Sequence, residues 1–340
     1  MRTSGGGAPG IEVAGLSKRF GSVRAVNDLS FSVAPGRITG FLGPNGAGKT
    51  TTLRILLGLV DASSGTATIG GRRYRKIPRP LHEVGALLES TSFHPARRAR
   101  DHLRMVARAG RIDRARVGAV LEVVGLGEVA KRRVGGFSMG MRQRLGLATA
   151  LLGDPGVLIL DEPANGLDPQ GIAWLRELLR YLANEGRTVL VSSHLLAEMA
   201  QTIDDVVIIS EGQLRASGPL STLTRQVRSS VRVRTPDADR LTELLRPRFP
   251  AIRRLAAELI AVDGATPEQI GPVLAEHRNL IHELVTESTD LESVFLSLTG
   301  PGRGGIAADP TPPGTAPGPA GPAVVAPPVP ATGWTESPPP

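Results

Sequence analysis

The feature that most constrains this chain is the segment at residues 43–50, GPNGAGKT, which lies between an apolar run and a helical pattern. It fits the pattern G-x-x-x-x-G-K-[ST] at every fixed position. The apolar run at residues 37–42 predicts a buried strand, and residues 50–59 predict a helix. A glycine-rich loop joining a strand to a helix indicates an α/β fold with an anion site at the start of the helix.

The residue types of this phosphate loop match phosphate chemistry. Glycines allow backbone N–H groups to converge on phosphate oxygens, and the helix directs its positive end at the same anion. Lys49 adds a positive charge for the β- and γ-phosphates, and the Thr50 hydroxyl is a hard oxygen ligand for Mg²⁺. The residues expected to bind the nucleotide are Gly43, Pro44, Asn45, Gly46, Ala47, Gly48, Lys49, Thr50 and Thr51.

Two carboxylates end another apolar run. Residues 157–160 read VLIL, as in a fully buried strand of a parallel sheet, and Asp161 and Glu162 follow directly. We expect Asp161 to hold Mg²⁺ through water and Glu162 to act as general base on the attacking water. The alternative is that the pair merely caps the next segment, which the phosphate loop disfavours.

The rest of the core alternates strands and helices, which predicts a mainly parallel sheet. Strands are expected at residues 84–88, 188–191 and 206–209, and helices at 171–184 and 195–202. Between about residues 89 and 153 the strand signal is replaced by helical patterns at 102–109, 114–124 and 139–152. We therefore expect a helical insertion in the α/β core.

The ends of the chain have a different character. Residues 1–10 are glycine-rich, lack the apolar region of a signal peptide and are expected to be disordered. Residues 218–299 predict a small α+β domain, with a strand at 230–234 and helices at 238–245 and 267–277. Residues 300–340 contain 13 of the 28 prolines and are expected to be disordered.

Composition excludes several classes of protein. The chain has no cysteine, so disulfides, thiolate zinc sites and cysteine nucleophiles are excluded. The net charge of +8 comes almost entirely from arginine, which we attribute to base composition, and no nucleic-acid partner is expected. No stretch is long and apolar enough to cross a membrane, so a membrane role would require a partner.

The segment at residues 137–144, FSMGMRQR, resembles the signature motif of ABC-type ATPases, usually written LSGGQ. Ser138 lies 23 residues before Asp161 at the start of a predicted helix, as in that family. The resemblance implies that Ser138, Gly140 and Met141 contact the γ-phosphate of ATP held by a second subunit. The alternative is that Ser138 only caps the helix.

Further positions match the same family in order along the chain. Phe20 stands where the family places an aromatic ring that stacks on adenine, and its alternative role is a core phenylalanine. Asp168, at the end of residues 165–168, resembles the D-loop, which crosses the dimer interface. His194 resembles the switch histidine that contacts the γ-phosphate and orients water. Glu89 stands where the family usually has glutamine, and its carboxylate can still approach Mg²⁺ or water.

The departures from the usual motifs point to one branch of the family. Phe137, Met139 and Met141 replace the usual signature residues. Together with Glu89 they look like the bacterial exporters of antibiotics, bacteriocins and lantibiotics. The segment at residues 288–299 resembles the ending of such subunits, with a plain amphipathic helix as the alternative.

The resemblance implies a P-loop NTPase of the ABC ATPase type over residues 11–217. Its RecA-like core would carry an antiparallel β subdomain and a helical subdomain at about 89–153. Such a subunit binds and hydrolyses ATP with Mg²⁺ and energises export of a drug, antibiotic, peptide or lipid-like compound through a separate membrane permease.

The family resemblance also implies partner proteins. Two ATP-binding subunits would pair head to tail as a homodimer or heterodimer. They would lie in the cytoplasm against the inner face of the membrane, and the permease would contact residues 89–102. The alternatives are a non-transport ABC ATPase in translation or DNA repair and an ATP-dependent regulatory module.

Overall fold

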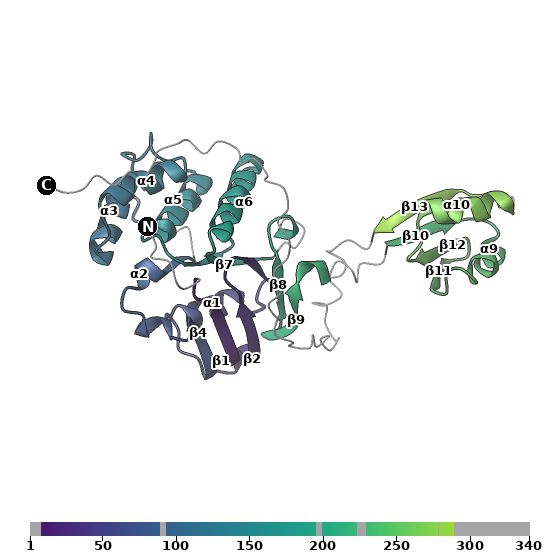
Figure 1. The fold of residues 1–340 in the computed structure, drawn as a ribbon, viewed down its shortest axis with the longest axis horizontal. Helices are drawn as coiled ribbons and strands as arrows, with labels where there is room; N and C mark the ends of the chain where they lie inside the picture. The colour runs from purple at the N-terminus through teal and green to yellow at the C-terminus, as the bar shows by residue number, and fades with distance from the viewer. Residues whose placement is uncertain (1–7, 89–92, 195–198, 223–228, 278, 289–340) are drawn as a thin grey trace, which may run out of the picture. The chain divides into compact units, whose positions relative to one another are not determined.

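The structure is a computed structural model that describes residues 8–88, 93–194, 199–222, 229–277 and 279–288 (Figure 1). Within these residues the strands form three sheets, and the buried hydrophobic side chains form three clusters. Glu89, the segment at 289–299 and the proline-rich tail lie outside the described residues, as do residues 1–7.

A six-stranded sheet forms the centre of the first 220 residues. Its order is β5 (Val84–Leu87), β6 (Val157–Asp161), β7 (Thr188–Ser193), β3 (Ile38–Leu42), β8 (Asp205–Ser210) and β9 (Gln213–Pro219). The first five strands are parallel and β9 is antiparallel to β8. The predicted parallel sheet is confirmed. The carboxyl ends of β3, β6 and β7 meet at one edge of this sheet, which brings the phosphate loop beside Asp161.

The two faces of this sheet carry different layers, because alternate residues of a strand point to opposite faces. Leu158 and Leu160 of β6 join the cluster built with α3 (Ala99–Gly110), α4 (Ala115–Val123), α5 (Met139–Leu151) and α6 (Pro169–Asn184). Val157 and Ile159 join the cluster built with α1 (Lys49–Leu56) and a second sheet. Figure 1 shows helices α3 to α6 on one side of β7 and the second sheet on the other.

The second sheet is the expected antiparallel β subdomain. It has the order β2 (Val23–Val33), β1 (Ile11–Phe20) and β4 (Ser64–Ile69), and all its pairs are antiparallel. Phe20 and Val23 pair across the tight turn between β1 and β2. The described part of residues 93–153 contains helices and no strand, as the sequence predicted.

Two helices end at least two residues earlier than predicted. The helix predicted over residues 50–59 ends at Leu56, because Gly58 adopts a left-handed backbone (φ 66°) and terminates it. Of the helix predicted over 195–202, the structure describes only residues 199–202. Met199 and Ala200 are helical, and a turn follows them. Two further short helical segments, α2 (Pro80–Glu83) and η1 (Tyr74–Lys76), precede β5, and η2 (Val134–Gly136) precedes α5.

The C-terminal part has the α+β architecture expected from its sequence. Its elements are β10 (Ser229–Arg234), α9 (Ala238–Leu245), β11 (Ile252–Ala256), β12 (Leu259–Asp263), α10 (Pro267–Glu276) and β13 (Glu283–Ser288). The sheet order β11-β12-β10-β13, with all pairs antiparallel, is the ferredoxin-like arrangement. Val231, Leu241 and Ile270 belong to its own hydrophobic core.

Candidate nucleotide-binding site

The phosphate loop leaves the start of α1 open to an anion. Gly46 (φ 80°) and Gly48 (φ 100°) adopt left-handed conformations, and Gly48 is the N-cap of the helix. Among the described residues no side chain caps this helix, and its first turn contains no acidic residue. The backbone N–H groups at the start of α1 therefore have no capping side chain from the described residues and can bind an anion.

The loop is held tightly between two strands. A Cβ on Gly48 would lie 2.4 Å from the carbonyl oxygen of Ala25 in β2, and a Cβ on Gly43 would lie 2.4 Å from that of Ile209 in β8. The Gly212 N–H also donates a 3.1 Å hydrogen bond to the Ala47 carbonyl. Glycine is required at both positions because any side chain would displace the neighbouring backbone.

Lys49 is buried in the loop, with 6% of its surface exposed. Its Nζ donates to the carbonyl oxygens of Gly43 at 2.6 Å and Pro44 at 3.3 Å, and lies 3.6 Å from Glu162 Oε1. Burial lowers the pKa of Lys49, while the charges of Glu162 and Asp161 oppose that shift. The ammonium is thus poorly solvated, so it interacts strongly with an incoming phosphate.

Thr50 and Asp161 supply neighbouring oxygen atoms for a cation. Thr50 Oγ1 donates a 2.8 Å hydrogen bond to Asp161 Oδ2, and the Ser192 hydroxyl donates to Asp161 Oδ1. Asp161 and Ser192 pair in register on the adjacent strands β6 and β7. A hydroxyl and a carboxylate this close are the hard donors that Mg²⁺ prefers, and they fit such an ion.

Glu162 is fixed by hydrogen-bonding contacts besides its ion pair with Lys49. Its N–H donates to Ser192 Oγ at 3.0 Å, its carbonyl accepts from Gln143 Nε2 at 3.1 Å, and His194 Nδ1 lies 3.0 Å from its Oε2. Its backbone is left-handed (φ 48°), which is unfavourable for a residue other than glycine. Strain of this kind persists where the surroundings impose it, and it is concentrated at functional sites.

Ser192 and Gln143 are the members of this network that the sequence did not reveal as functional. Ser192 is fully buried and Gln143 is 2% exposed. Serine and glutamine are common residues, and neither belongs to the pattern that marks the phosphate loop. The one available signal was that Gln143 lies five residues after Ser138 on the same helix.

Phe20 lies at the end of β1 with 51% of its surface exposed. This exposure excludes the alternative of a core phenylalanine. The hairpin that carries it also carries Ala25, whose carbonyl oxygen packs against Gly48. The structure therefore presents an exposed aromatic ring on the strand pair that borders the phosphate loop.

The signature segment and Asp168 lie together in a second group. Ser138 Oγ accepts from the Met141 N–H at 3.2 Å and caps α5, and Asp168 Oδ1 accepts from the Gly171 N–H at 2.9 Å and caps α6. A Cβ on Gly140 would lie 3.1 Å from the Gly166 carbonyl oxygen, so the two segments are in contact. In the described part of the chain, no hydrogen bond joins this group to the phosphate loop.

The loop at the start of α1 and the two acids that end β6 define a class of protein, the P-loop nucleotide-binding proteins. Comparison with known proteins identifies the family. The model of the ABC transporter family matches residues 26–165. Residues 229–292 match a domain of unknown function (DUF8746).

The alignments with several curated relatives span most of the length of those relatives. The bacitracin transport ATP-binding protein BcrA of Bacillus licheniformis is 42% identical over 70% of this chain and 79% of its own. BcrA of Enterococcus faecalis is 33% identical over 87% of this chain and 98% of its own. The lantibiotic transport ATP-binding protein SrtF of Streptococcus pyogenes is 37% identical over 60% of this chain and 88% of its own.

A solved structure, described as the ATP binding subunit of an ABC transporter, superposes with a TM-score of 0.58 at 30% identity. The superposition covers 64% of this chain and 92% of the chain in that structure. The chain belongs to the family of ABC transporter ATP-binding proteins. Its bacitracin and lantibiotic relatives confirm the branch expected from the sequence.

Proposed function

We propose that this chain binds and hydrolyses ATP and so energises export of an antibiotic, peptide, drug or lipid-like compound through a separate membrane permease. The observation that carries the proposal is the fixed position of Glu162 beside Asp161, Lys49 and His194. The relatives named for bacitracin and lantibiotic transport support the transport role. No relative named above supports a role in translation, DNA repair or regulation without transport.

Each group in the site has a proposed part in binding. The N–H groups of the phosphate loop, with Lys49, hold the β- and γ-phosphates, and the exposed ring of Phe20 stacks on adenine. Thr50 and Asp161 hold Mg²⁺, which supplies positive charge to the phosphate oxygens when bound. Glu89 is proposed to approach the same ion or its water, although it lies outside the described residues.

Glu162 and His194 have the proposed catalytic parts. The Glu162 carboxylate accepts a proton from the attacking water, and its contacts with Lys49 and His194 keep it beside the phosphate loop. His194, through the contact of its Nδ1 with Glu162 Oε2, keeps the carboxylate in place and faces the γ-phosphate. Lys49 neutralises charge on the transferred group.

The second group of residues is proposed to act on a neighbouring subunit. Ser138, Gly140 and Met141 lie at the N-terminus of α5, which is a further anion site. We propose that they contact the γ-phosphate held by a second ATP-binding subunit, and that Asp168 lies at that interface. Paired head to tail, two copies or two related chains would close on ATP and open after hydrolysis.

The proposed location follows from the proposed partner. No helix in the described part of the chain combines the length and apolarity needed to cross a membrane. We propose that the protein lies in the cytoplasm against the inner face of the membrane, held there by the permease through residues 89–102. The proposed domain limits are those given by the sequence: 11–217 for the ATPase and 218–299 for the appendage. Of residues 1–10, which were expected to be disordered, the described residues 8–10 are instead held by the fold: Ala8 is buried, and the Pro9 carbonyl accepts a hydrogen bond from Thr188.

The test replaces Glu162 by glutamine. Glu162→Gln keeps the size and a polar contact for His194 but removes the base, so we expect ATPase activity to fall about 100-fold or more, with ATP binding retained. The variant should also accumulate as an ATP-bound dimer, which size-exclusion chromatography detects. Activity within a few-fold of the unmodified protein would show that Glu162 is not the base.

A matched control is Glu185→Gln. Glu185 is the C-cap of α6 and pairs with Arg187 at 2.7 Å on the surface. The Glu185 side chain is 38% exposed, and Arg187 keeps Asp154 as a partner at 3.1 Å when the charge of Glu185 is removed. This variant should therefore retain full turnover, and a loss of activity in both variants would point to a general effect of lost charge.

A further inference from the structure

An interaction next to the exposed ring of Phe20 is not part of the function proposed above. The Nζ of Lys18 lies 4.8 Å from the centroid of the Phe20 ring. Lys18 and Phe20 are two residues apart at the end of β1, where the register with β2 shifts between Lys18 and Arg19. An ammonium over an aromatic face at this distance makes a cation–π interaction.

The same ammonium is hydrogen-bonded to the chain beyond the C-terminal end of α1. Lys18 Nζ donates a 2.8 Å hydrogen bond to the carbonyl oxygen of Asp61, in the segment that follows α1. The Asp61 carboxylate is in turn 2.9 Å from Arg75, which donates through Nε to the Gly58 carbonyl. Lys18 therefore connects the aromatic ring to the helix whose other end is the phosphate loop.

The backbone around Lys18 strengthens this connection. The Ser63 N–H donates to the Ser17 carbonyl at 2.8 Å, and the Arg19 N–H donates to Ser63 Oγ at 3.1 Å. These bonds tie β1 to the segment before β4 on both sides of Lys18. The ammonium is thus held from its backbone and from its tip, while Phe20, at the hairpin end, is half exposed.

We propose that Lys18 is a positioning residue for nucleotide binding, which fixes the Phe20 ring from one face and leaves the other face for adenine. The proposal rests on the proposed role of Phe20 as the adenine platform. A phenylalanine at a hairpin end has no hydroxyl to orient it. The ammonium supplies that constraint, so part of the cost of ordering the ring is met before ATP arrives.

The test compares ATP with inorganic tripolyphosphate, which has phosphates but no base. In Lys18→Met, a substitution of similar length without charge, the dissociation constant for ATP should rise about two- to fivefold, the size expected for one exposed cation–π contact. The constant for tripolyphosphate should not change, and neither should kcat. Equal weakening of both ligands would overturn the proposal, because Lys18 would then act through the phosphate loop.

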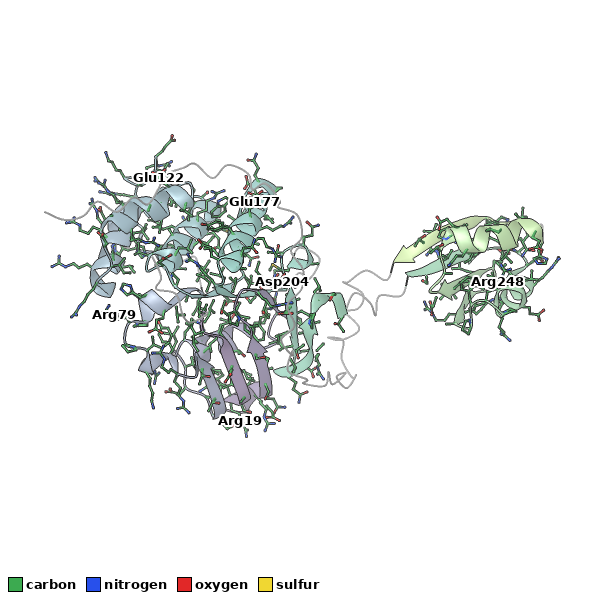
Figure 2. All side chains as sticks on the ribbon, viewed as in Figure 1. Arg19, Arg79, Glu122, Glu177, Asp204 and Arg248 are labelled. Carbon is green, nitrogen blue, oxygen red and sulfur yellow. The ribbon has the colours of Figure 1, made fainter. Side chains whose placement is uncertain are left out.

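Arg19→Met is the matched control. It removes the neighbouring positive charge on β1, and Figure 2 shows Arg19 at the solvent-facing end of the second sheet. This variant should bind ATP as the unmodified protein does. Lys18→Arg, which keeps a cation over the ring, should restore binding. A Lys18→Met variant that binds ATP unchanged, or more tightly, would overturn the proposal.

A double-mutant cycle separates this inference from the function on which it rests. If Phe20→Ala weakens ATP binding and Lys18→Met adds nothing further in that background, Lys18 acts through the ring. If Phe20→Ala weakens binding and Lys18→Met adds its own full effect, the positioning role is wrong but the platform is retained. If Phe20→Ala binds ATP normally, the adenine platform itself is wrong, and the inference is overturned with it.

Discussion

The two groups of proposed nucleotide-binding residues differ in how they are held. Around Asp161 and Glu162, side chains from α1, β7 and α5 bond to the Asp161 carboxylate and to the Glu162 backbone, across long stretches of sequence. Around Ser138 and Asp168, each side chain bonds only to a backbone N–H three residues ahead. The first group is assembled by the fold of one chain. The second is locally satisfied, as expected of a surface that meets its ligand only when a second subunit brings it.

A loss of activity as large as that expected for Glu162→Gln should come from the second group. Asp is as good an N-cap as Ser, so Ser138→Asp keeps the cap of α5, but it places a negative charge where a γ-phosphate is proposed to bind. We expect ATPase activity to fall about 100-fold or more with an unchanged melting temperature, because like charges repel at close range. Activity close to normal would reduce Ser138 to a helix cap.

Mixing two inactive variants sharpens the same comparison. Lys49→Met removes the phosphate contact of one half-site, and Ser138→Asp removes that of the other. A head-to-tail dimer of one chain of each kind contains one intact composite site. Random pairing should therefore restore about a quarter of the normal sites. A mixture as inactive as its components would contradict a site shared between subunits.

A smaller effect is expected for Ser192→Ala, within the first group. The change removes the hydroxyl that donates to Asp161 and accepts from the Glu162 N–H, so two buried polar groups lose a partner. Residues that orient ligands in this way typically contribute about 10–100-fold, and we expect a fall in turnover of that order.

The control for this prediction lies at the other end of the same strand. Thr188 is equally buried and donates a 3.0 Å hydrogen bond to the Pro9 carbonyl. Thr188→Ala should lower the melting temperature comparably and leave turnover unchanged. If both variants lose only stability, Ser192 is a packing residue and not a part of the site.

The smallest effect concerns the stability of the nucleotide-free protein. Burial lowers the pKa of Lys49, so keeping it charged costs free energy in the folded state at neutral pH. We expect Lys49→Met to melt at a slightly higher temperature than the unmodified protein at pH 7. A lower melting temperature would mean that the contacts of Lys49 with the loop outweigh its burial.

The pH dependence of the melting temperature tests whether the burial of Lys49 causes this effect. Between the lowered pKa of Lys49 and its ordinary value, the unfolded state binds more protons than the folded state, so the unmodified protein gains stability as pH rises. Lys49→Met lacks this term. The difference in melting temperature should therefore shrink as pH is raised from 7 towards 10, and a constant difference would contradict the assigned cause.

Where the sequence succeeded, the information was local. The phosphate loop requires glycines at fixed spacings, and β6 requires an unbroken apolar run before Asp161. Most helix positions followed from periodicity, and the end of α1 was missed by three residues because Gly58 was not recognised as its terminator. The expected roles of Ser138, His194 and Phe20 came from the family resemblance, because no local sequence pattern distinguishes these residues.

By itself, the sequence determined the class of fold and the chemistry of its motifs, because these depend on residues close together along the chain. Only the tertiary structure decided which distant residues complete the site. Ser192 bridges Asp161 and Glu162 because β6 and β7 are adjacent in one register, and Gln143 reaches the Glu162 carbonyl because α5 packs on the sheet. Lys18 reaches the Asp61 carbonyl because β1 lies beside the segment that precedes β4. Such contacts arise from strand order and helix packing, which local sequence patterns do not specify.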